Sequence, residues 1–234
     1  MANAQERHPI DGPGTTASFD LLAWSYCDAP KPDLPEVPML LRRRAGTADR
    51  LALRAAFDCL AQQPLAPAAT LFASRHGEVH RSIEILDALK AGEVPSPMAF
   101  SLSVHNASAG LYSMARLDKA PSSALSAGPE SLGMALFEAA ALLKTGCSPV
   151  LVVAYDEALP EAMKPFATDE DAPYALALMV GAVGGRPCTL TLRHGTSASE
   201  SVTQGKRLAA ALQSGQPTAD LSLGTRRWSW GHRA

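Results

Sequence analysis

The sequence predicts a layered α/β domain. Its mixed β-sheet is flanked by helices, and one central helix of the domain is buried. Short apolar runs alternate with segments of helical periodicity along most of the chain, as in layered α/β proteins. Residues 131–144 are apolar on nearly every face, with only Glu138 interrupting, which is typical of a helix buried on all sides. Two strand-like runs near the C-terminus flank a Gly184-Gly185 turn.

The chain is expected to fold as one domain. Residues 1–16 are polar and are expected to be a disordered lead, and residues 17–234 form the domain. Phe19–Trp24 is predicted to be the first strand, and Asp28–Pro38 is a proline-rich connector.

The next elements follow from apolar spacing. A helix over Ala48–Leu60, with Thr47 as its N-cap, is predicted because apolar residues recur at i, i+3, i+4 and i+7. Ala68–Ala73 reads as a strand that leads into a loop. The middle of the chain is expected to contain helices over Ser82–Leu89 and Ser103–Ala115, a strand over Ala124–Ala127, a helix over Ser131–Lys144 and a strand over Val150–Tyr155.

The C-terminal third is predicted to begin with a hairpin of Tyr174–Val183 and Cys188–Arg193. A moderately amphipathic helix over about Ser201–Leu212 follows. The tail, Gly224–Ala234, holds Trp228 and Trp230 among arginines.

Charge and composition exclude several classes of function. The formal net charge of -2 does not favour nucleic acid or an anionic membrane as the main partner. The sequence has no apolar run approaching the roughly 20 residues that span a bilayer, and its first residues do not resemble a secretory signal. We therefore expect a cytoplasmic location without a membrane span.

The four cysteines are expected to be small core side chains. Cys27, Cys59, Cys147 and Cys188 lie far apart and form no C-x-x-C pair, which disfavours both a metal site and a disulfide framework. No cofactor is expected. Of the four, Cys147 is expected to be the most exposed, because it follows Gly146 in a turn after a helix.

The segment Phe100–Glu157 resembles the nucleophile-bearing part of the β-ketoacyl synthases, which have the thiolase-like fold. It contains FSLSVHN, then a Lys119-Ala-Pro-Ser turn, a short strand and a buried helix. The resemblance covers about Phe19 to Val183 and is strongest over Ser101–Glu157. Counted from Lys119, the position of the family's cysteine falls on Pro129.

This replacement implies a degenerate nucleophile elbow at Gly128, Pro129 and Glu130. A cysteine there would gain reactivity from the helix N-terminus, whereas proline has no nucleophilic atom but suits the first helical position. Glu130 would favour the helix start electrostatically. The two histidines of the family come from a second half, and 234 residues accommodate about one half of a synthase of roughly 400 residues. No catalytic residue is therefore expected.

The resemblance implies a chain length factor, the cysteine-free partner of an active ketosynthase, of the kind found in aryl polyene systems. In thiolase-like dimers the strand before the elbow pairs across the two-fold axis. The partner interface is therefore expected at Pro121, Ser122, Ser123, Ala124, Leu125, Ser126, Ser103 and Asn106. The alternative for the Ser103–Ala115 helix is ordinary core packing.

Two further sites are implied. The far end of the acyl tunnel is expected at Arg75, His76, Glu78 and Ser82, or else this loop is a solvated segment in which Arg75 pairs with Glu78. The triplet Arg42, Arg43 and Arg44 is a candidate docking site for an acidic acyl carrier protein, or else a solvated charged face.

Two other readings of the function remain open. An independent serine-dependent acyl hydrolase or acyltransferase would use Ser126 or Ser131 with His105 or His76. A carrier-protein-binding module would lack a tunnel function. The HGT sequence at His194 is reminiscent of a synthase motif, but we interpret it as coincidence because it ends a strand of the first half.

Overall fold

The computed structural model describes residues 14–167, 172–194, 202–223 and 225–232. In these residues the chain forms one eight-stranded mixed sheet with the order β3-β2-β4-β5-β1-β6-β8-β7. The strands are β1 (Thr15–Cys27), β2 (Ala69–Ala73), β3 (Ser122–Leu125), β4 (Val150–Asp156), β5 (Tyr174–Gly181), β6 (Arg186–His194), β7 (Thr218–Leu223) and β8 (Arg226–His232). The helices are α1 (Met39–Arg42), α2 (Thr47–Leu60), α3 (Val79–Lys90), α4 (Pro97–Ser101), α5 (Ala107–Arg116), α6 (Ser131–Lys144) and α7 (Gln204–Gln213), with a 3₁₀ helix η1 at Glu161–Phe166.

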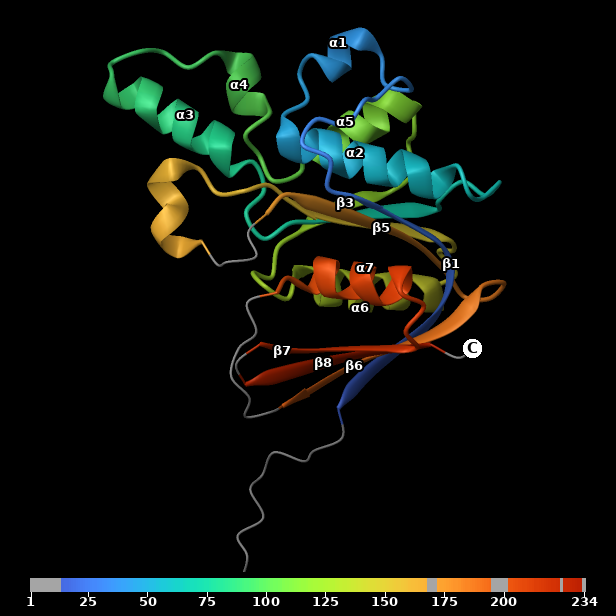
Figure 1. Cartoon of the computed structure of the whole chain (residues 1–234). Helices are drawn as coiled ribbons and strands as arrows, with labels where there is room; N and C mark the ends of the chain where they lie inside the picture. Colours follow the sequence, from blue (N-terminus) through green and yellow to red (C-terminus); the bar gives the residue numbers. More distant parts are fainter. Residues whose placement is uncertain (1–13, 168–171, 195–201, 224, 233–234) are drawn as a thin grey trace, which may run out of the picture.

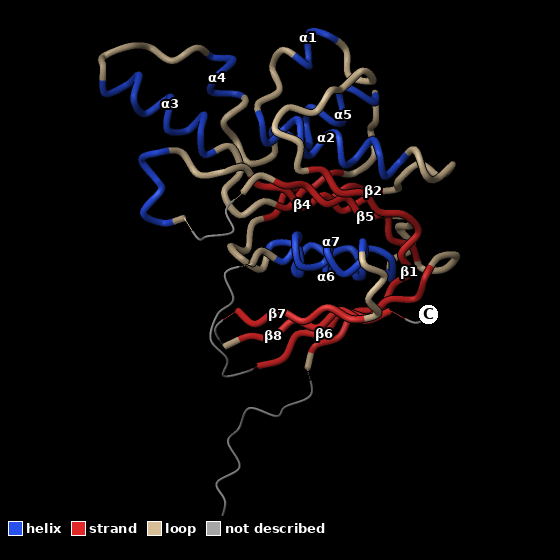
Figure 2. Tube along the Cα trace, in the orientation of Figure 1, coloured by secondary structure: helices blue, strands red, loops and turns tan. Residues whose placement is uncertain are grey.

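The sheet bends along β1, so that its two halves face each other across α6 and α7 (Figures 1 and 2). Helices α2 and α5 cover the outer face of the half that contains β2, β4 and β5. The outer face of the β6-β8-β7 half carries polar residues such as Thr189, Asp220 and Arg227, which are exposed. The layers thus run helix, sheet, helix, sheet, and the last sheet is open to solvent on its outer side.

Strand β1 makes this bend possible because it belongs to both halves. It pairs antiparallel with β5 along Asp20–Cys27 and antiparallel with β6 along Thr15–Leu21, on opposite edges. The chain therefore crosses over β1 between β5 and β6. At the crossing, a Cβ on Gly185 would lie 2.4 Å from the carbonyl oxygen of Leu21, so only glycine allows the approach.

The hairpin predicted for Tyr174–Val183 and Cys188–Arg193 is therefore wrong. Both segments are strands, but each pairs with β1 and they lie on opposite sides of it. A Gly-Gly sequence between two strands favours a tight reversal, and here the glycines instead allow the chain to pass over a third strand. Strand β1, with which both segments pair, lies far earlier in the chain. The Gly185 N–H, for example, donates to the carboxylate of Asp20, 165 residues before it.

The parallel strands β2, β3 and β4 bring together the segments that follow them in the chain. Strands β2, β3 and β4 are mutually parallel, with β3 at the edge of the sheet. The loop after β2, the elbow after β3 and Asp156 of β4 therefore lie together at the C-terminal ends of these strands. This is the end of a parallel sheet at which α/β proteins usually bind their ligands.

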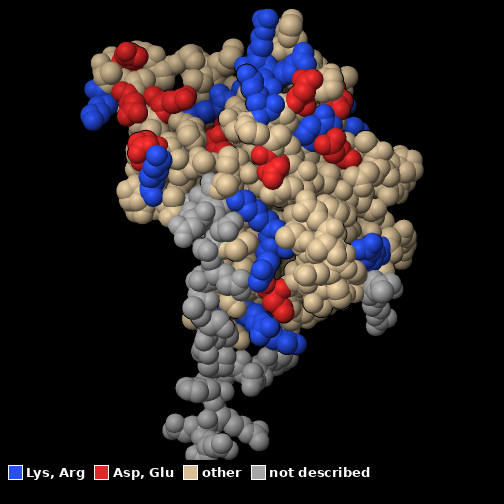
Figure 3. Space-filling model, viewed as in Figure 1, with Lys and Arg blue, Asp and Glu red and all other residues tan. Residues whose placement is uncertain are grey.

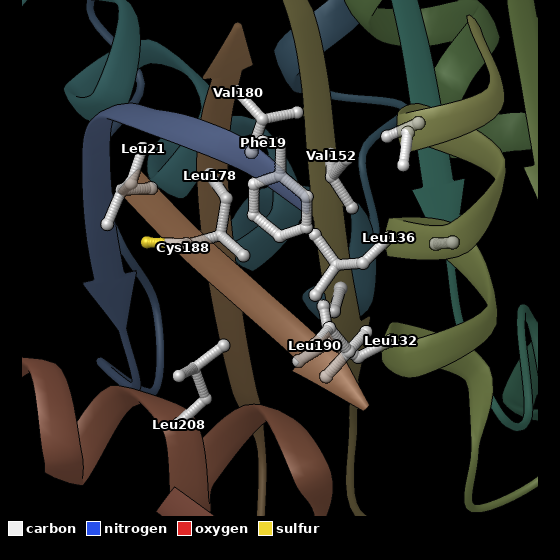
Figure 4. Close-up of a cluster of buried hydrophobic side chains, with 14 of the residues drawn as sticks. Phe19, Leu21, Leu132, Leu136, Val152, Leu178, Val180, Cys188, Leu190 and Leu208 are labelled. Atoms are coloured by element: carbon white, nitrogen blue, oxygen red, sulfur yellow. The ribbon is translucent and has the colours of Figure 1, made fainter. Parts of the chain in front are cut away.

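The described residues form two hydrophobic cores, one on each face of the β2-β4-β5 half. The first lies between the two sheet halves and contains Phe19, Leu136, Val152 and Leu190 (Figure 4). The second lies under α2 and α5 and contains Phe72, Tyr112 and Tyr155. Strand β4 contributes to both, and this explains its uninterrupted apolar sequence.

Several element boundaries differ from the predictions. Strand β1 begins at Thr15, so residues 15 and 16 belong to the sheet and not to a disordered lead, while residues 1–13 lie outside the described residues. Helix α2 begins at Thr47, so Thr47 is not its N-cap; the N–H of the preceding Gly46 donates to the Asp49 carboxylate. The Asp49 side chain is fully buried.

The helix predicted over Ser103–Ala115 begins later than expected, as α5 at Ala107, and a short helix that was not predicted, α4, precedes it. Ser96 and Pro97 begin α4, which ends at Ser101, and α5 begins at Ala107. The Ser103 hydroxyl donates to the Phe100 carbonyl, as serine does where it competes with helix formation.

The region after α6 contains more sheet than predicted. Strand β7 was not predicted, and the tail forms β8. None of the helices in the described part of the chain is long and apolar enough to cross a membrane.

Candidate functional site at the elbow before α6

The elbow is a tight turn between β3 and α6. Gly128 adopts a left-handed conformation with φ +58°, and the Glu130 N–H donates to the Ala127 carbonyl. The Ser131 hydroxyl donates to the Gly128 carbonyl (2.7 Å) and accepts from the Ala127 N–H (3.0 Å). Pro129 lies in the middle of this turn with its ring exposed. The turn has the sharp reversal predicted for a nucleophile elbow, without a nucleophile at its centre.

The carboxylate of Glu130 is held by two residues of β8. The Arg226 guanidinium donates to one oxygen at 2.5 Å, and the Trp228 indole N–H donates to the other at 2.9 Å. The Glu130 side chain is only 13% exposed. A negative charge at this place is favourable because the N-terminus of α6 carries the positive end of the helix dipole.

The first turn of α6 is also closed by α7. The Gly133 N–H donates to the Gln204 side-chain oxygen at 2.9 Å, and Gln204 is buried. A Cβ on Gly133 would lie 2.4 Å from the Trp228 ring, so glycine lets the indole lie directly on the helix backbone. The Gln204 side chain thus satisfies one N–H of the first turn of α6, whereas the Glu130 carboxylate binds β8 and no helix N–H.

The serines proposed for the alternative enzyme are engaged in backbone hydrogen bonds. The Ser131 hydroxyl belongs to the turn, and the Ser126 hydroxyl donates to the Arg75 carbonyl at 3.3 Å. The His105 ring nitrogen Nε2 faces the Ser74 carbonyl at 3.1 Å. This arrangement does not favour a serine–histidine pair.

The structure places His194 nearer to the elbow than the sequence suggested. His194 lies at the end of β6, opposite Arg226 of β8. Both line a hollow beside Met134 of α6, so the end of β6 reaches the same end of the helix as the elbow. The residue after His194 lies outside the described residues.

Of the residues expected at the partner interface, residues 121–126 lie in or beside β3 at the free edge of the sheet, whereas Ser103 and Asn106 lie between α4 and α5. Strand β3 is the last strand of the order and pairs with β2 alone among the described residues. Pro121, Ser122, Ser123, Ser126 and Asn106 are exposed, whereas Ala124, Leu125 and Ser103 are half-buried.

The loop expected at the tunnel end is fixed to the end of β4. Asp156 accepts hydrogen bonds from the Ser74 hydroxyl (2.7 Å), the Arg75 N–H (3.2 Å) and the His76 N–H (3.0 Å). The Gly77 N–H in turn donates to the Ser74 hydroxyl. The acidic residue at the end of this strand therefore has a structural role.

Glu78 pairs with Arg81 and not with Arg75, which corrects the salt bridge considered from the sequence. The Arg81 guanidinium contacts Glu78 at 2.8 Å, Asp49 at 3.2 Å and the Arg44 carbonyl at 2.6 Å. A second buried donor, the Ser108 hydroxyl, binds the other Asp49 oxygen at 2.7 Å.

This buried cluster contains two carboxyl groups and one guanidinium. Burial, and next the neighbouring Asp49 carboxylate, raises the pKa of Glu78 to about 8. The raised pKa favours the protonated form of Glu78 at neutral pH. Asp49 occupies the same face of α2 as Ala52 and Ala56, so its helical spacing could have predicted its burial.

The arginine triplet does not form one patch. The Arg42 side chain lies 3.8 Å from the Asp33 carboxylate, whereas Arg43 and Arg44 are exposed. Arg43 and Arg44 line an open depression together with Glu84 and Glu157, so the charge there is mixed.

The cysteines are small core residues, as predicted. Cys27, Cys59 and Cys188 are buried and Cys147 is half-buried. Burial raises the pKa of Cys59 to about 12 and that of Cys188 to about 11, so neither is a thiolate at neutral pH. The described residues contain no group of three or more His, Cys, Asp or Glu side chains suited to a metal ion.

The fold and the elbow define a ketosynthase-like protein. Residues 21–231 match the sequence model of the β-ketoacyl synthase N-terminal domain. The chain therefore belongs to this family, and the match extends through β8, well beyond the Val183 limit inferred from the sequence. A comparison with curated proteins finds no match.

Solved structures share the fold of this chain. A ketosynthase (ApeO) in complex with its chain length factor (ApeC) from Xenorhabdus doucetiae matches with a TM-score of 0.80 and 26% identity, over 92% of this chain and 99% of that chain. The two matched chains are thus nearly equal in length. The ishigamide ketosynthase/chain length factor has a TM-score of 0.58 at 16% identity, over 78% of this chain and 68% of that chain. A β-ketoacyl synthase from Burkholderia phymatum STM815 has a TM-score of 0.56 at 14% identity, but this chain spans only 52% of that one.

Proposed function

We propose that this protein is a non-catalytic chain length factor, which pairs with an active β-ketoacyl synthase and shapes its acyl tunnel in aryl polyene biosynthesis. The observation that carries the proposal is the elbow. Pro129 replaces the nucleophile, and Glu130, Gln204 and Trp228 engage the groups around the α6 N-terminus. The similarity to a ketosynthase–chain length factor complex supports the same role.

The partner would dock on the free edge of β3. Edge strands present unpaired backbone groups, which a second sheet can extend. An unprotected edge beside half-buried Ala124 and Leu125 suits such pairing. The occupant would be the corresponding strand of the ketosynthase.

Co-expression with the cognate ketosynthase and native mass measurement test the complex. A one-to-one assembly is expected, and Ala124→Asp should disrupt it because pairing would bury an unpaired charge. Thr218→Asp on β7, the opposite edge of the same sheet, is the control and should leave the assembly intact. A ketosynthase that purifies without this chain would contradict the proposal.

The tunnel role assigns the loop after β2 and the start of α3 to the distal end of the acyl chain. Residues Arg75, His76, Glu78 and Ser82 would limit product length there. The anchoring of the Arg75 and His76 backbone on Asp156 suits a rigid boundary. Ser82→Phe should shorten the polyene products, whereas Gln213→Phe at the end of α7 should not. Products of unchanged length from the Ser82 variant would remove the tunnel role while leaving the complex in place.

An acyl carrier protein is a further proposed partner. Arg43 and Arg44 are exposed and would meet its carboxylates, whereas Arg42 is turned toward Asp33. Weaker transfer from the carrier by an Arg43→Glu complex, with assembly unchanged, would support this docking. The complex would act in the cytoplasm, as the composition predicts.

A further inference from the structure

A small hollow lies between helices α6 and α7 and the inner face of the β6-β8-β7 half of the sheet. Its volume is about 40 Å³, and its walls are mainly leucine side chains and the rings of Trp228 and Trp230. Figure 4 shows four of the leucines, which come from α6, β6 and α7: Leu132, Leu136, Leu190 and Leu208. The residues of the loop after β2 do not line it, so the hollow is separate from the proposed tunnel end.

The hollow adjoins a buried hydrogen-bond donor that the described residues leave without an acceptor. The Trp230 side chain is only 4% exposed, and its indole N–H has no partner among these residues. In the strand register Trp230 lies between Leu190 and Ala219, and all three residues line the hollow. An unpaired buried donor costs free energy, so an acceptor supplied by a ligand in the hollow would be favoured.

The other polar groups around the hollow are donors as well. The Gln204 side-chain oxygen already accepts from the Gly133 N–H, which leaves only the NH₂ group of this amide for another partner. Arg207 is exposed and lines the hollow from α7, where its Nε donates to the Asp220 carbonyl at 3.0 Å.

The charge on this face selects an anion. None of the described residues that line the hollow is an aspartate or a glutamate. Figure 3 shows Lys and Arg side chains gathered in a band over α7 on this face. Because carboxylates bind such donors more strongly than neutral acceptors do, the matching head group is a carboxylate.

The size of the hollow limits the apolar part of the ligand. One buried water needs roughly 10–15 Å³ on this measure, so 40 Å³ accommodates a slender group of about three or four heavy atoms. The leucine walls favour carbon atoms over water there, since they offer no hydrogen bonds. An unbranched chain fits this space, whereas a ring system exceeds it.

We propose that this hollow binds a short unbranched carboxylic acid, such as butanoate or pentanoate. Its alkyl chain would lie among the leucines, and its carboxylate would accept from the Trp230 indole N–H and from Arg207. This site goes beyond the proposed function, and no partner subunit is needed to form it.

Titration of the full-length protein with pentanoate tests the site. The indole N–H signals in ¹H–¹⁵N NMR spectra report on it directly, and Trp230→Phe identifies the Trp230 signal. That signal should shift saturably, with a dissociation constant at or below about 1 mM. Pentylamine has the same chain but a cationic head group that cannot accept a hydrogen bond, and it should leave the signal in place.

Two variants locate the ligand. Ala219→Leu places a larger side chain beside Trp230 from the half-buried β7 strand and should weaken pentanoate binding about ten-fold or more. Arg207→Gln should weaken it about three-fold or more. Lys144→Gln removes the same charge from the exposed far end of α6 and should leave the affinity unchanged. If Ala219→Leu lowers the melting temperature, the Arg207 and Lys144 pair still decides.

The negative results are equally specific. A Trp230 signal that does not saturate with pentanoate, or that shifts equally with pentylamine, would overturn the proposal and leave the hollow to water. Binding that neither Ala219→Leu nor Arg207→Gln weakens would overturn it by placing the ligand elsewhere. Because the titration contains no ketosynthase, these outcomes are independent of the chain length factor role.

Discussion

The Glu130 carboxylate and the Arg226 guanidinium, 96 residues apart in the chain, meet at 2.5 Å in front of α6. This contact joins the elbow to β8, the last strand that the structure describes. The C-terminal strand β8 thus packs against the start of α6.

Removing the Glu130 carboxylate should destabilise the protein. Glu130→Ala leaves the Trp228 indole N–H without its acceptor and Arg226 without its counter-ion, and we expect a loss of about 1–2 kcal/mol in the free energy of unfolding. Urea denaturation measures this loss. Glu138→Ala, on the exposed side of the same helix, should change it by less than about 0.5 kcal/mol. Equal effects of the two substitutions would contradict the assigned role of Glu130.

Two helix glycines should respond in opposite directions to alanine. Gly133→Ala places a Cβ against the Trp228 ring and should cost about 1–3 kcal/mol through overpacking. Gly110→Ala, on the exposed face of α5 with open space around it, should stabilise the isolated protein by about 0.5–1 kcal/mol through helix propensity. Thermal unfolding of both variants checks the pair, and stabilisation by Gly133→Ala would show that the indole does not pack there.

The buried Glu78 should make stability depend on pH. Its pKa is raised from 4.5 to about 8, so the folded protein keeps a proton that the unfolded chain releases between these values. The free energy of unfolding should therefore fall as the pH rises from about 4.5 to about 8, and the fall should be complete above that pKa. Glu78→Gln retains a donor toward Asp49 and an acceptor for Arg81 but does not ionise.

Glu78→Gln should consequently flatten this part of the pH profile and exceed the parent protein in stability by about 1–2 kcal/mol at pH 9. Chemical denaturation at several pH values measures the profile. Glu84→Gln, an exposed neighbour on α3, is the control and should follow the parent curve. Parallel profiles for the Glu78 variant and the parent protein would exclude a protonated Glu78.

A cysteine at position 129 should not by itself give the isolated chain condensing activity. In Pro129→Cys the thiol would stand at a helix start whose nearby donors already bind Glu130 and Gln204, and the two histidines of an active synthase would still be missing. Neither acylation of the isolated chain nor decarboxylation of a malonyl-carrier substrate is expected. Pro129→Ala controls for loss of the ring, and an acyl-enzyme detected by mass measurement in the cysteine variant alone would refute this account.

The local elements followed from local patterns. The boundaries of α6 agree with the prediction because its apolar run and its flanking turns are short-range signals. Strand β4 was likewise evident from an uninterrupted apolar run. The partners of the C-terminal strands could not be predicted in the same way. Pairing of β6 with β1 and β8 depends on segments far apart in the chain, and the Gly184-Gly185 signal fits a hairpin equally well.

The same division holds for the site. A sharp turn around Pro129 before a buried helix could be predicted from residue spacing, and the assignment of Pro129 to the position of the family's nucleophile stays a prediction. The partners of Glu130 could not be predicted, because Arg226 and Trp228 lie in a strand whose position depends on the bend of β1. Trp228 and Trp230 were noticeable as two large aromatic residues in a charged tail, and their burial against α6 and Phe19 appears only in the folded chain.

By itself, the sequence determined the alternation of strands and helices, the buried helix and the absence of sulfur at the elbow, since each depends on residues close in the chain. Only the tertiary structure decided that the C-terminal strands close over this helix and leave a small hollow beside it. Those features arise from long-range strand pairing and from side-chain burial, which local sequence patterns do not encode.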